Sequence, residues 1–225
     1  MDFSYLILIP ALILSLWAQF SVQSAYKKYG AIRNARGITG RETSQRILNA
    51  NGISNVQIAP IAGELTDNYN PKTNVISLSQ GVYDQSSIAA VSVAAHETGH
   101  AIQHAVGYAA IKARNAILPV TQIASMASMP LLLIGFVLGL LWLVRLGIIM
   151  YAAVLLFQVV TLPVEFNASS RALKTINEMD ILDGEELKGA KKMLRAAAMT
   201  YVAAAATSAL QLLRFIMIAN SGRRD

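Results

Sequence analysis

The chain has 225 residues, of which 54% are hydrophobic and 14% are charged, and its formal net charge at pH 7 is +6. This composition differs from that of an average soluble protein and favours an integral membrane protein. The absence of cysteine excludes disulfides and thiolate metal sites, so a metal here needs His and carboxylate ligands. The basic residues lie beside apolar stretches, which is typical of membrane topology signals and not of a nucleic-acid surface.

The first apolar stretch runs from Phe3 to Phe20 and is long enough to cross a bilayer. It has neither a basic segment before it nor a small-residue cleavage site after it, so we expect an uncleaved transmembrane anchor over residues 1–22. Six basic residues follow, against the single acid Glu42: Lys27, Lys28, Arg33, Arg36, Arg41 and Arg46. The positive-inside rule then places this side in the cytoplasm and the N-terminus outside.

Residues 23–115 form a predicted cytoplasmic region. The capping box Thr39-Gly-Arg-Glu42 predicts the start of a short helix, and Asn51-Gly52 predicts its end. Two strand-like runs, Val56–Ile58 and Val75–Leu78, flank a polar turn at Asp67–Pro71. This pattern predicts a short β-hairpin or a small sheet before the next helix.

That next helix carries the sequence His96-Glu97-x-x-His100, the signature of zinc peptidases. Residues 84–87 offer a cap for its start, and Gly107 is its expected end. Residues four apart on a helix point the same way, so His96 and His100 can reach one ion. Glu97 lies close enough to act as the general base on a zinc-activated water.

From Ala116 to Val164 the only charged residue is Arg145, which predicts two transmembrane helices over 116–164, joined near Trp142–Gly147. The sequence Gly135-x-x-x-Gly139 is typical of close helix packing. The polar segment 165–195 then returns to the cytoplasmic side, where it shares a side with the two histidines. Residues 196–225 form a predicted fourth transmembrane helix and tail, with an amphipathic helix packed on the other helices as the rival interpretation. The predicted fold is therefore mostly α and integral to the membrane, with three to four transmembrane helices. A small zincin-like catalytic region at 23–115 carries the short β-hairpin or sheet.

A catalytic zinc takes three protein ligands and a water. The candidates for the third ligand are His104 and four acids: Glu165, Glu178, Glu185 and Glu186. On a continuous helix, His104 lies about 6 Å further along the axis than His100, which argues against ligation by His104. Glu165 directly follows an apolar span. Ser169, one helical turn later, could hydrogen-bond a ligand histidine.

Two segments carry a family resemblance: His96-Glu-Thr-Gly-His-Ala-Ile-Gln-His104 and Pro163-Val-Glu-Phe-Asn-Ala-Ser169. They resemble the YugP-type neutral zinc metallopeptidases, which are membrane gluzincins similar to the HtpX and prenyl-protein endopeptidase types. The resemblance covers nearly the whole chain, and it implies one Zn²⁺ per chain held by His96, His100 and Glu165. The chain departs from the pattern at Asn167 and Ser169, where acids are expected.

The predicted function is an integral-membrane zinc endopeptidase that cleaves membrane or membrane-proximal polypeptides on the cytoplasmic side of the cell membrane. His104, Arg171 and Tyr201 are candidate donors to the oxyanion. By analogy with other zincins, an extended substrate could add to an exposed strand edge near Val75–Leu78. The expected partners are the polypeptide substrate and the lipid bilayer, with a second copy of the chain or a membrane scaffold protein as open alternatives.

The alternative function is a non-catalytic membrane protein, either an inactive protease-like scaffold or a metal-transport element. A transporter should hold acidic ligands at mid-membrane depth, and the apolar spans contain no acid. A scaffold would be expected to lose Glu97, which is not needed to hold zinc. Both observations favour the peptidase.

Overall fold

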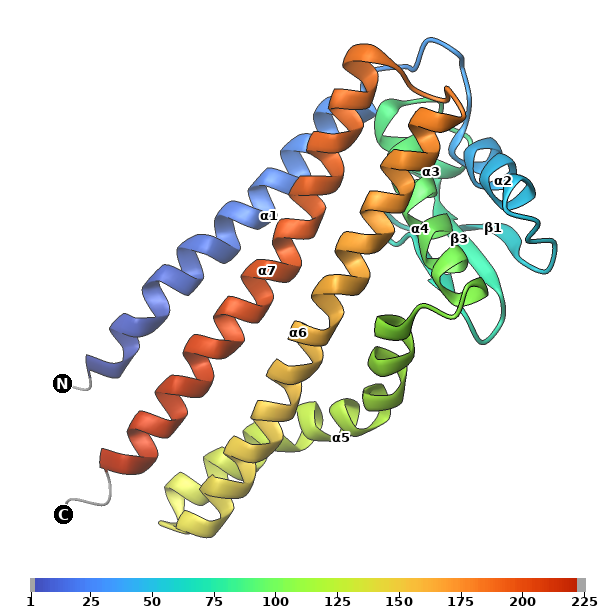
Figure 1. Ribbon diagram of the computed structural model, residues 1–225. Helices are drawn as coiled ribbons and strands as arrows, with labels where there is room; N and C mark the ends of the chain where they lie inside the picture. Colours follow the sequence, from blue (N-terminus) through green and yellow to red (C-terminus); the bar gives the residue numbers. More distant parts are fainter. Residues whose placement is uncertain (1–2, 222–225) are drawn as a thin grey trace. The chain divides into compact units, whose positions relative to one another are not determined.

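The computed structural model describes residues 3–221, and the side chains of residues 6–220 (Figure 1). The chain is mostly helical, with a small three-stranded sheet, as predicted. In chain order the elements are the 3₁₀ helix η1 (Phe3–Leu8), α1 (Ile9–Gly30), α2 (Gly40–Ala50), β1 (Gln57–Ile61), β2 (Asn68–Asn70), β3 (Val75–Ser79), α3 (Gln80–Tyr83), α4 (Ile88–Ala105), α5 (Ala109–Val137), α6 (Leu141–Glu178) and α7 (Gly184–Ser221).

The chain divides into two compact units. The first unit comprises the described residues within 1–19, 112–163 and 200–225, and the second comprises 20–111 and 164–199. The helices α1, α5, α6 and α7 each contribute residues to both units, while α2, α3, α4 and the sheet belong wholly to the second. The two units are described separately below.

Four helices within the described residues are long and apolar enough to cross a membrane: Leu6–Gly30, Ala109–Val137, Leu141–Glu178 and Gly184–Asn220. Many of their large apolar side chains are exposed, as lipid-facing surfaces require, including Ile13, Phe20, Ile123 and Met126. These helices indicate a multi-pass membrane protein. With 38 residues each, α6 and α7 are about 57 Å long, which is more than a bilayer of about 30 Å needs.

The turn between α5 and α6 lies at Leu138–Leu140, earlier than the expected Trp142–Gly147. Gly139 adopts φ +67° there, a left-handed conformation that a side chain disfavours and that commonly ends a helix. Of the two glycines predicted to pack helices, Gly139 therefore forms the turn, while Gly135 packs against α6.

Close packing in this unit involves two other contacts. A Cβ on Gly135 of α5 would lie 2.8 Å from the backbone nitrogen of Val144, and one on Gly147 of α6 would lie 2.7 Å from Cγ of Leu132. Leu132 and Val144 are buried together with Phe215 of α7, so this cluster joins three helices. At the α1–α7 contact, the hydroxyls of Ser15 and Thr207 are hydrogen-bonded at 2.9 Å.

The sheet of the second unit has the strand order β1-β3-β2, with β1 parallel and β2 antiparallel to β3. Both predicted strands are present, but they are parallel neighbours and not the two arms of a hairpin. The hairpin is formed by β2 and β3, and β2 occupies the segment Asp67–Pro71 that was expected to be a turn. This strand was missed because it has three residues, of which only Tyr69 is apolar enough to mark the buried face.

The strand β3 is central in the sheet, because its residues pair with β1 on one edge and with β2 on the other. The hypothesis that a substrate adds to an exposed edge at Val75–Leu78 is therefore wrong. In the described residues, the edges without a strand partner belong to β1 and β2.

The helix α4 packs against α2 and the sheet, as Figure 1 shows. Its shared core contains Leu48, Ile76, Leu78, Val82, Ala90, Ala94 and Ala101. The Thr98 hydroxyl donates to Ser44 Oγ at 2.9 Å, which adds a buried polar contact between α4 and α2. These contacts fix the rotation of α4 about its own axis, and therefore the direction in which its two histidines point.

The predicted helix ends of this unit are confirmed. Thr39 and Glu42 form the reciprocal capping box of α2. The Ser87 hydroxyl accepts from the backbone N–H of Ala90 and caps α4. Gly107, at φ +63°, follows the last turn of α4.

Candidate metal centre

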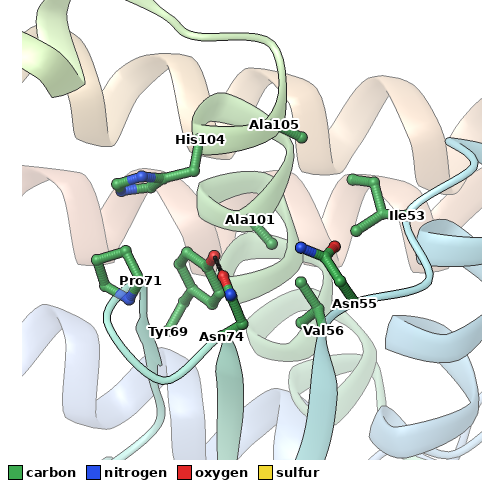
Figure 2. A pocket seen from close by; sticks show the side chains of 9 residues that line it. All are labelled: Ile53, Asn55, Val56, Tyr69, Pro71, Asn74, Ala101, His104 and Ala105. Atoms are coloured by element: carbon green, nitrogen blue, oxygen red, sulfur yellow. Dashed lines mark hydrogen bonds between the residues drawn. The ribbon is translucent and has the colours of Figure 1, made fainter.

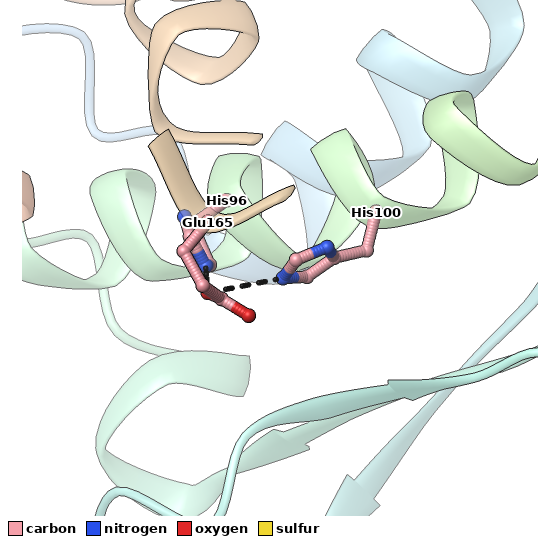
Figure 3. A group of neighbouring side chains, drawn as sticks. All are labelled: His96, His100 and Glu165. Atoms are coloured by element: carbon pink, nitrogen blue, oxygen red, sulfur yellow. Dashed lines mark ion pairs between the residues drawn. The ribbon is translucent and has the colours of Figure 1, made fainter. Parts of the chain in front are cut away.

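Two helices, α4 and α6, bring His96, His100 and Glu165 together (Figure 3). The Oε2 atom of Glu165 lies 3.3 Å from Nε2 of His96 and 3.6 Å from Nε2 of His100. One ligand atom from each residue falls within 4.8 Å of the others. The helix α6 runs through Pro163 without a break, so Glu165 lies inside a helix and has a fixed position along it.

The chemistry of this cluster fits a zinc ion. Among the described residues, the buried Oε2 of Glu165 has no hydrogen-bond partner, which is costly for a carboxylate unless a cation compensates it. Two imidazoles and one carboxylate are a ligand set that zinc commonly takes in catalytic sites. The cluster therefore has the donors and the unpaired buried oxygen that a bound metal would explain.

The two helices approach closely at Gly99, between the two histidines. A Cβ at this position would lie 2.8 Å from the carbonyl oxygen of Ala168 on α6. Any larger residue would need one of the helices to move. The glycine inside the zinc signature thus allows the approach that brings Glu165 to the histidines.

Each histidine is oriented through its second ring nitrogen. Nδ1 of His96 lies 3.1 Å from Oγ of Ser169, so the hydrogen bond predicted for Ser169 is present. Nδ1 of His100 lies 3.0 Å from Oε1 of Gln103. If both Nδ1 atoms are protonated, both Nε2 atoms are free to face Glu165 and bind a metal.

Gln103 is the main residue of the site that sequence reasoning missed. Its Nε2 donates to the carbonyl oxygen of Val164 at 2.8 Å and to Oδ1 of Asn167 at 3.0 Å. Because a carbonyl only accepts, these bonds orient the amide and leave Oε1 to accept from His100. The available signal was its position, three residues after His100 and seven after His96, which places all three on one face of a helix.

Asn167 links this amide to Arg171. Its Oδ1 accepts from Gln103 and also from Nε of Arg171, at 2.8 Å. A neutral carbonyl oxygen at Asn167 is therefore sufficient to organise the polar contacts beside the ligands. The asparagine that departs from the expected acid has an identifiable structural role.

Glu97 lies between the two histidines in sequence, about 100° around the helix from His96. Burial raises the pKa of Glu97, with an opposing effect from His96 and His100 and a further increase from Glu165 and Asp67. Burial disfavours the charged form of His100, but Glu165, Glu97 and Gln103 together outweigh burial and raise the pKa of His100. The carboxylates thus favour positive charge at this site, as a cation site requires.

The other candidate residues lie outside the cluster. His104 faces the sheet, where its ring meets Tyr69 edge-on at a centroid distance of 5.5 Å. Tyr201 belongs to the first unit. The three remaining acids have contacts elsewhere: Glu178 with Lys174, Glu185 with Lys188, and Glu186 with the backbone N–H of Ala35.

Comparisons with known proteins agree with this centre. The sequence model of a family described as "Putative neutral zinc metallopeptidase" matches residues 4–220. A protein of Bacillus subtilis (strain 168), described as "Putative membrane protease YugP", is 49% identical over 217 residues, which are 96% of each chain. No solved structure matches the chain. The matched region includes α4, α6 and all four candidate membrane spans, and the chain belongs to the neutral zinc metallopeptidase family.

Proposed function

We propose that the chain is an integral-membrane zinc endopeptidase of the gluzincin type, with one Zn²⁺ held by His96, His100 and Glu165. The observation that carries this proposal is the buried Oε2 of Glu165, which has no hydrogen-bond partner among the described residues and faces Nε2 of both histidines. The hydrogen bonds that the other ring nitrogens make to Ser169 and Gln103 support it, because metal-binding histidines are generally oriented in this way.

The reaction is hydrolysis of a peptide bond, in which a C–O bond forms and the C–N bond breaks. Zinc at this site supplies a Lewis acid that polarises the peptide carbonyl and lowers the pKa of a water. Glu97 takes the proton of the attacking water on its carboxylate and delivers it to the leaving amine.

The strand β2 is the best support for an extended substrate. The strand packs against α4, and Tyr69 within β2 contacts the ring of His104. The strand therefore lies beside the helix that carries Glu97 and His104. Its outer edge has no strand partner in the described residues, so a peptide can pair with it beside the catalytic glutamate.

The active site faces the cytoplasm in this proposal. The basic residues that follow the first span support this orientation. The loop placed outside supports it too, because Arg145 is the only charged residue between Ala116 and Val164. Because Glu165 directly follows the apolar part of α6, the substrates are membrane or membrane-proximal polypeptides.

Cysteine labelling tests the orientation, because the natural chain has no cysteine. A single cysteine at exposed Ser54 should react with a membrane-impermeant maleimide only after lysis of the cells. A single cysteine at Leu138, in the α5–α6 turn, should react in intact cells. The reverse pattern would place the active site outside.

Metal analysis with parallel proteolysis tests the enzyme. We expect the purified wild type to contain about one zinc and to cleave an unfolded protein. Glu97→Gln should keep its zinc and lose cleavage, and Glu165→Ala should lose most of its zinc. Full zinc retention in Glu165→Ala, with loss in His104→Ala, would show that the ligand set is wrong. A wild type that binds zinc but cleaves nothing would favour the scaffold or transport alternative.

A further inference from the structure

A cavity of about 250 Å³ lies in the second unit, between α4, the β2–β3 hairpin and the segment that precedes β1 (Figure 2). Ala101, His104 and Ala105 of α4 form one wall, and Tyr69 and Asn74 of the hairpin form another. Figure 2 shows His104 above the hairpin, with the two alanines along the same helix. The metal ligands do not line this cavity, so it is distinct from the centre described above.

The cavity lies on the catalytic face of α4. Glu97 and His104 are seven residues apart, which places them on nearly the same side of the helix and about 10 Å apart along its axis. Ala101 lies between them and lines the cavity. The strand β2 packs against the same helix, and its Tyr69 touches His104 and lines the cavity. A peptide that pairs with the outer edge of β2 therefore passes the cavity within a few residues.

The lining determines which side chain the cavity can accept. None of its nine residues is Asp or Glu, so a Lys or Arg side chain would enter without a charged partner, at a high desolvation cost. An acidic side chain would meet no Lys or Arg and only the imidazole of His104. Ala101 and Ala105 give it depth, because neither has a side chain beyond Cβ. The ring of Tyr69 lines it, and the Tyr69 hydroxyl is hydrogen-bonded to Oδ1 of Asn74 at 3.1 Å.

We propose that this cavity is a specificity subsite that receives one substrate side chain and selects a large uncharged one, aromatic or long aliphatic. This inference rests on the proposed endopeptidase activity and names the substrate feature that the site recognises. The residues Asn55 and Asn74 provide amide groups in the lining, which can accommodate the hydroxyl of a tyrosine side chain.

The test narrows the cavity by substitution of a lining residue that is exposed to solvent. Ala105 is exposed on α4, so Ala105→Leu adds bulk to the cavity without entering the protein core. Ala109→Leu is the matched control, because Ala109 is also exposed and does not line the cavity. Each full-length, zinc-loaded protein in detergent micelles is given β-casein, and its cleavage sites are mapped by mass spectrometry.

In the wild type, we expect large uncharged residues to be enriched at one fixed position relative to the cleaved bond. Ala105→Leu should lower cleavage at these sites roughly tenfold or more and shift the preference to small residues, while Ala109→Leu cleaves as the wild type does. Zinc content should be equal in all three proteins. If Ala105→Leu loses zinc, Asn55→Phe is tested in its place, because this substitution narrows the cavity from the opposite wall.

Two outcomes overturn the inference. The first is that the narrowed variant cleaves at the same sites as the wild type, while Glu97→Gln abolishes cleavage. This result rejects the subsite and leaves the endopeptidase proposal intact. Enrichment of charged residues at the fixed position also rejects it. A wild type that binds zinc and cleaves nothing rejects the endopeptidase, and the subsite with it.

Discussion

Gly99 of α4 lies directly against the main chain of Ala168 in α6, so that a methyl group on Gly99 would stand 2.8 Å from the Ala168 carbonyl oxygen. Three residues before Ala168, α6 presents Glu165 to the two histidines that flank Gly99. The distance between these helices therefore determines whether three ligand atoms can share one ion.

Replacing Gly99 with alanine should weaken zinc binding. The added methyl group must displace α6 or α4, which moves Glu165 away from the histidines, and we expect zinc affinity to fall by about tenfold or more. Competition against a chromophoric chelator measures this affinity. Gly30→Ala is the matched control, because nothing lies within 4 Å of a Cβ at Gly30. Equal affinity in the two variants would show that α4 and α6 need not approach so closely.

Replacing Gln103 with methionine should also weaken zinc binding, by about 10- to 100-fold. Methionine keeps approximately the same volume but removes the acceptor for His100 Nδ1 and the donor to the Val164 carbonyl. With zinc in excess, cleavage should be largely restored, since Gln103 positions a ligand and does not touch the substrate.

Gln45→Met serves as its control, because Gln45 is exposed and its side chain donates a hydrogen bond to Oδ1 of Asn49, on the same helix and away from the ligands. A Gln103→Met protein that binds zinc as tightly as the wild type would remove the positioning role. A protein that is saturated with zinc and remains inactive would give Gln103 a different role in catalysis.

Replacing Ile76 with alanine should destabilise the second unit by about 2–5 kcal/mol, the usual cost of such a truncation in a packed core. Ile76 is fully buried on the central strand β3, under α4. Urea unfolding of the zinc-free protein in micelles measures the change. Ile32→Ala, at a position with 41% exposure, should change the free energy of unfolding by less than about 0.5 kcal/mol. Comparable effects of the two substitutions would contradict the central position of β3.

The stability of the zinc-free protein should depend on Asp67 in acid. Burial raises the pKa of Asp67 above its usual value near 3.8, against the effect of two hydrogen bonds from Ser79. Ionisation of Asp67 therefore costs the folded state more than the unfolded state. This cost is absent below about pH 3.8 and complete above the raised value, so it grows as pH increases between them.

Asp67→Asn lacks this titration and keeps an acceptor for the Ser79 N–H. The free energy of unfolding of Asp67→Asn, relative to that of the wild type, should therefore increase as pH rises from 3.5 to 7. Urea unfolding at several pH values measures this difference. Asp84→Asn provides the baseline for removing an exposed carboxylate. A stability difference between Asp67→Asn and wild type that stays constant with pH would contradict the expectation.

Features that depend on neighbouring residues could be predicted from the sequence. The capping box at Thr39 and Glu42 and the facing pair His96 and His100 follow from helical spacing alone. Glu165 is 65 residues beyond His100, and its assignment depended on a family resemblance as well as on its place after an apolar span. The spatial grouping of these three side chains is a property of the folded chain.

Features that depend on tertiary packing could not be predicted. The order β1-β3-β2 depends on which strand pairs with which, and the three-residue β2 gives almost no periodic signal. Gly139 has a positive φ and forms a turn instead of a helix contact. A glycine is compatible with either role, so the sequence alone does not distinguish them. Gln103 resembles any polar helical residue until its complete burial and its partners are known.

The length of β2 limits how a substrate can be held. In a strand, alternate residues direct their N–H and C=O groups to the same edge, so a three-residue strand offers such groups from about two residues at its outer edge. Main-chain pairing would thus contribute only a few hydrogen bonds, each of about 1 kcal/mol. Recognition would depend on side chains and on confinement near the membrane, and an enzyme of this kind would need only a short unfolded stretch in its target.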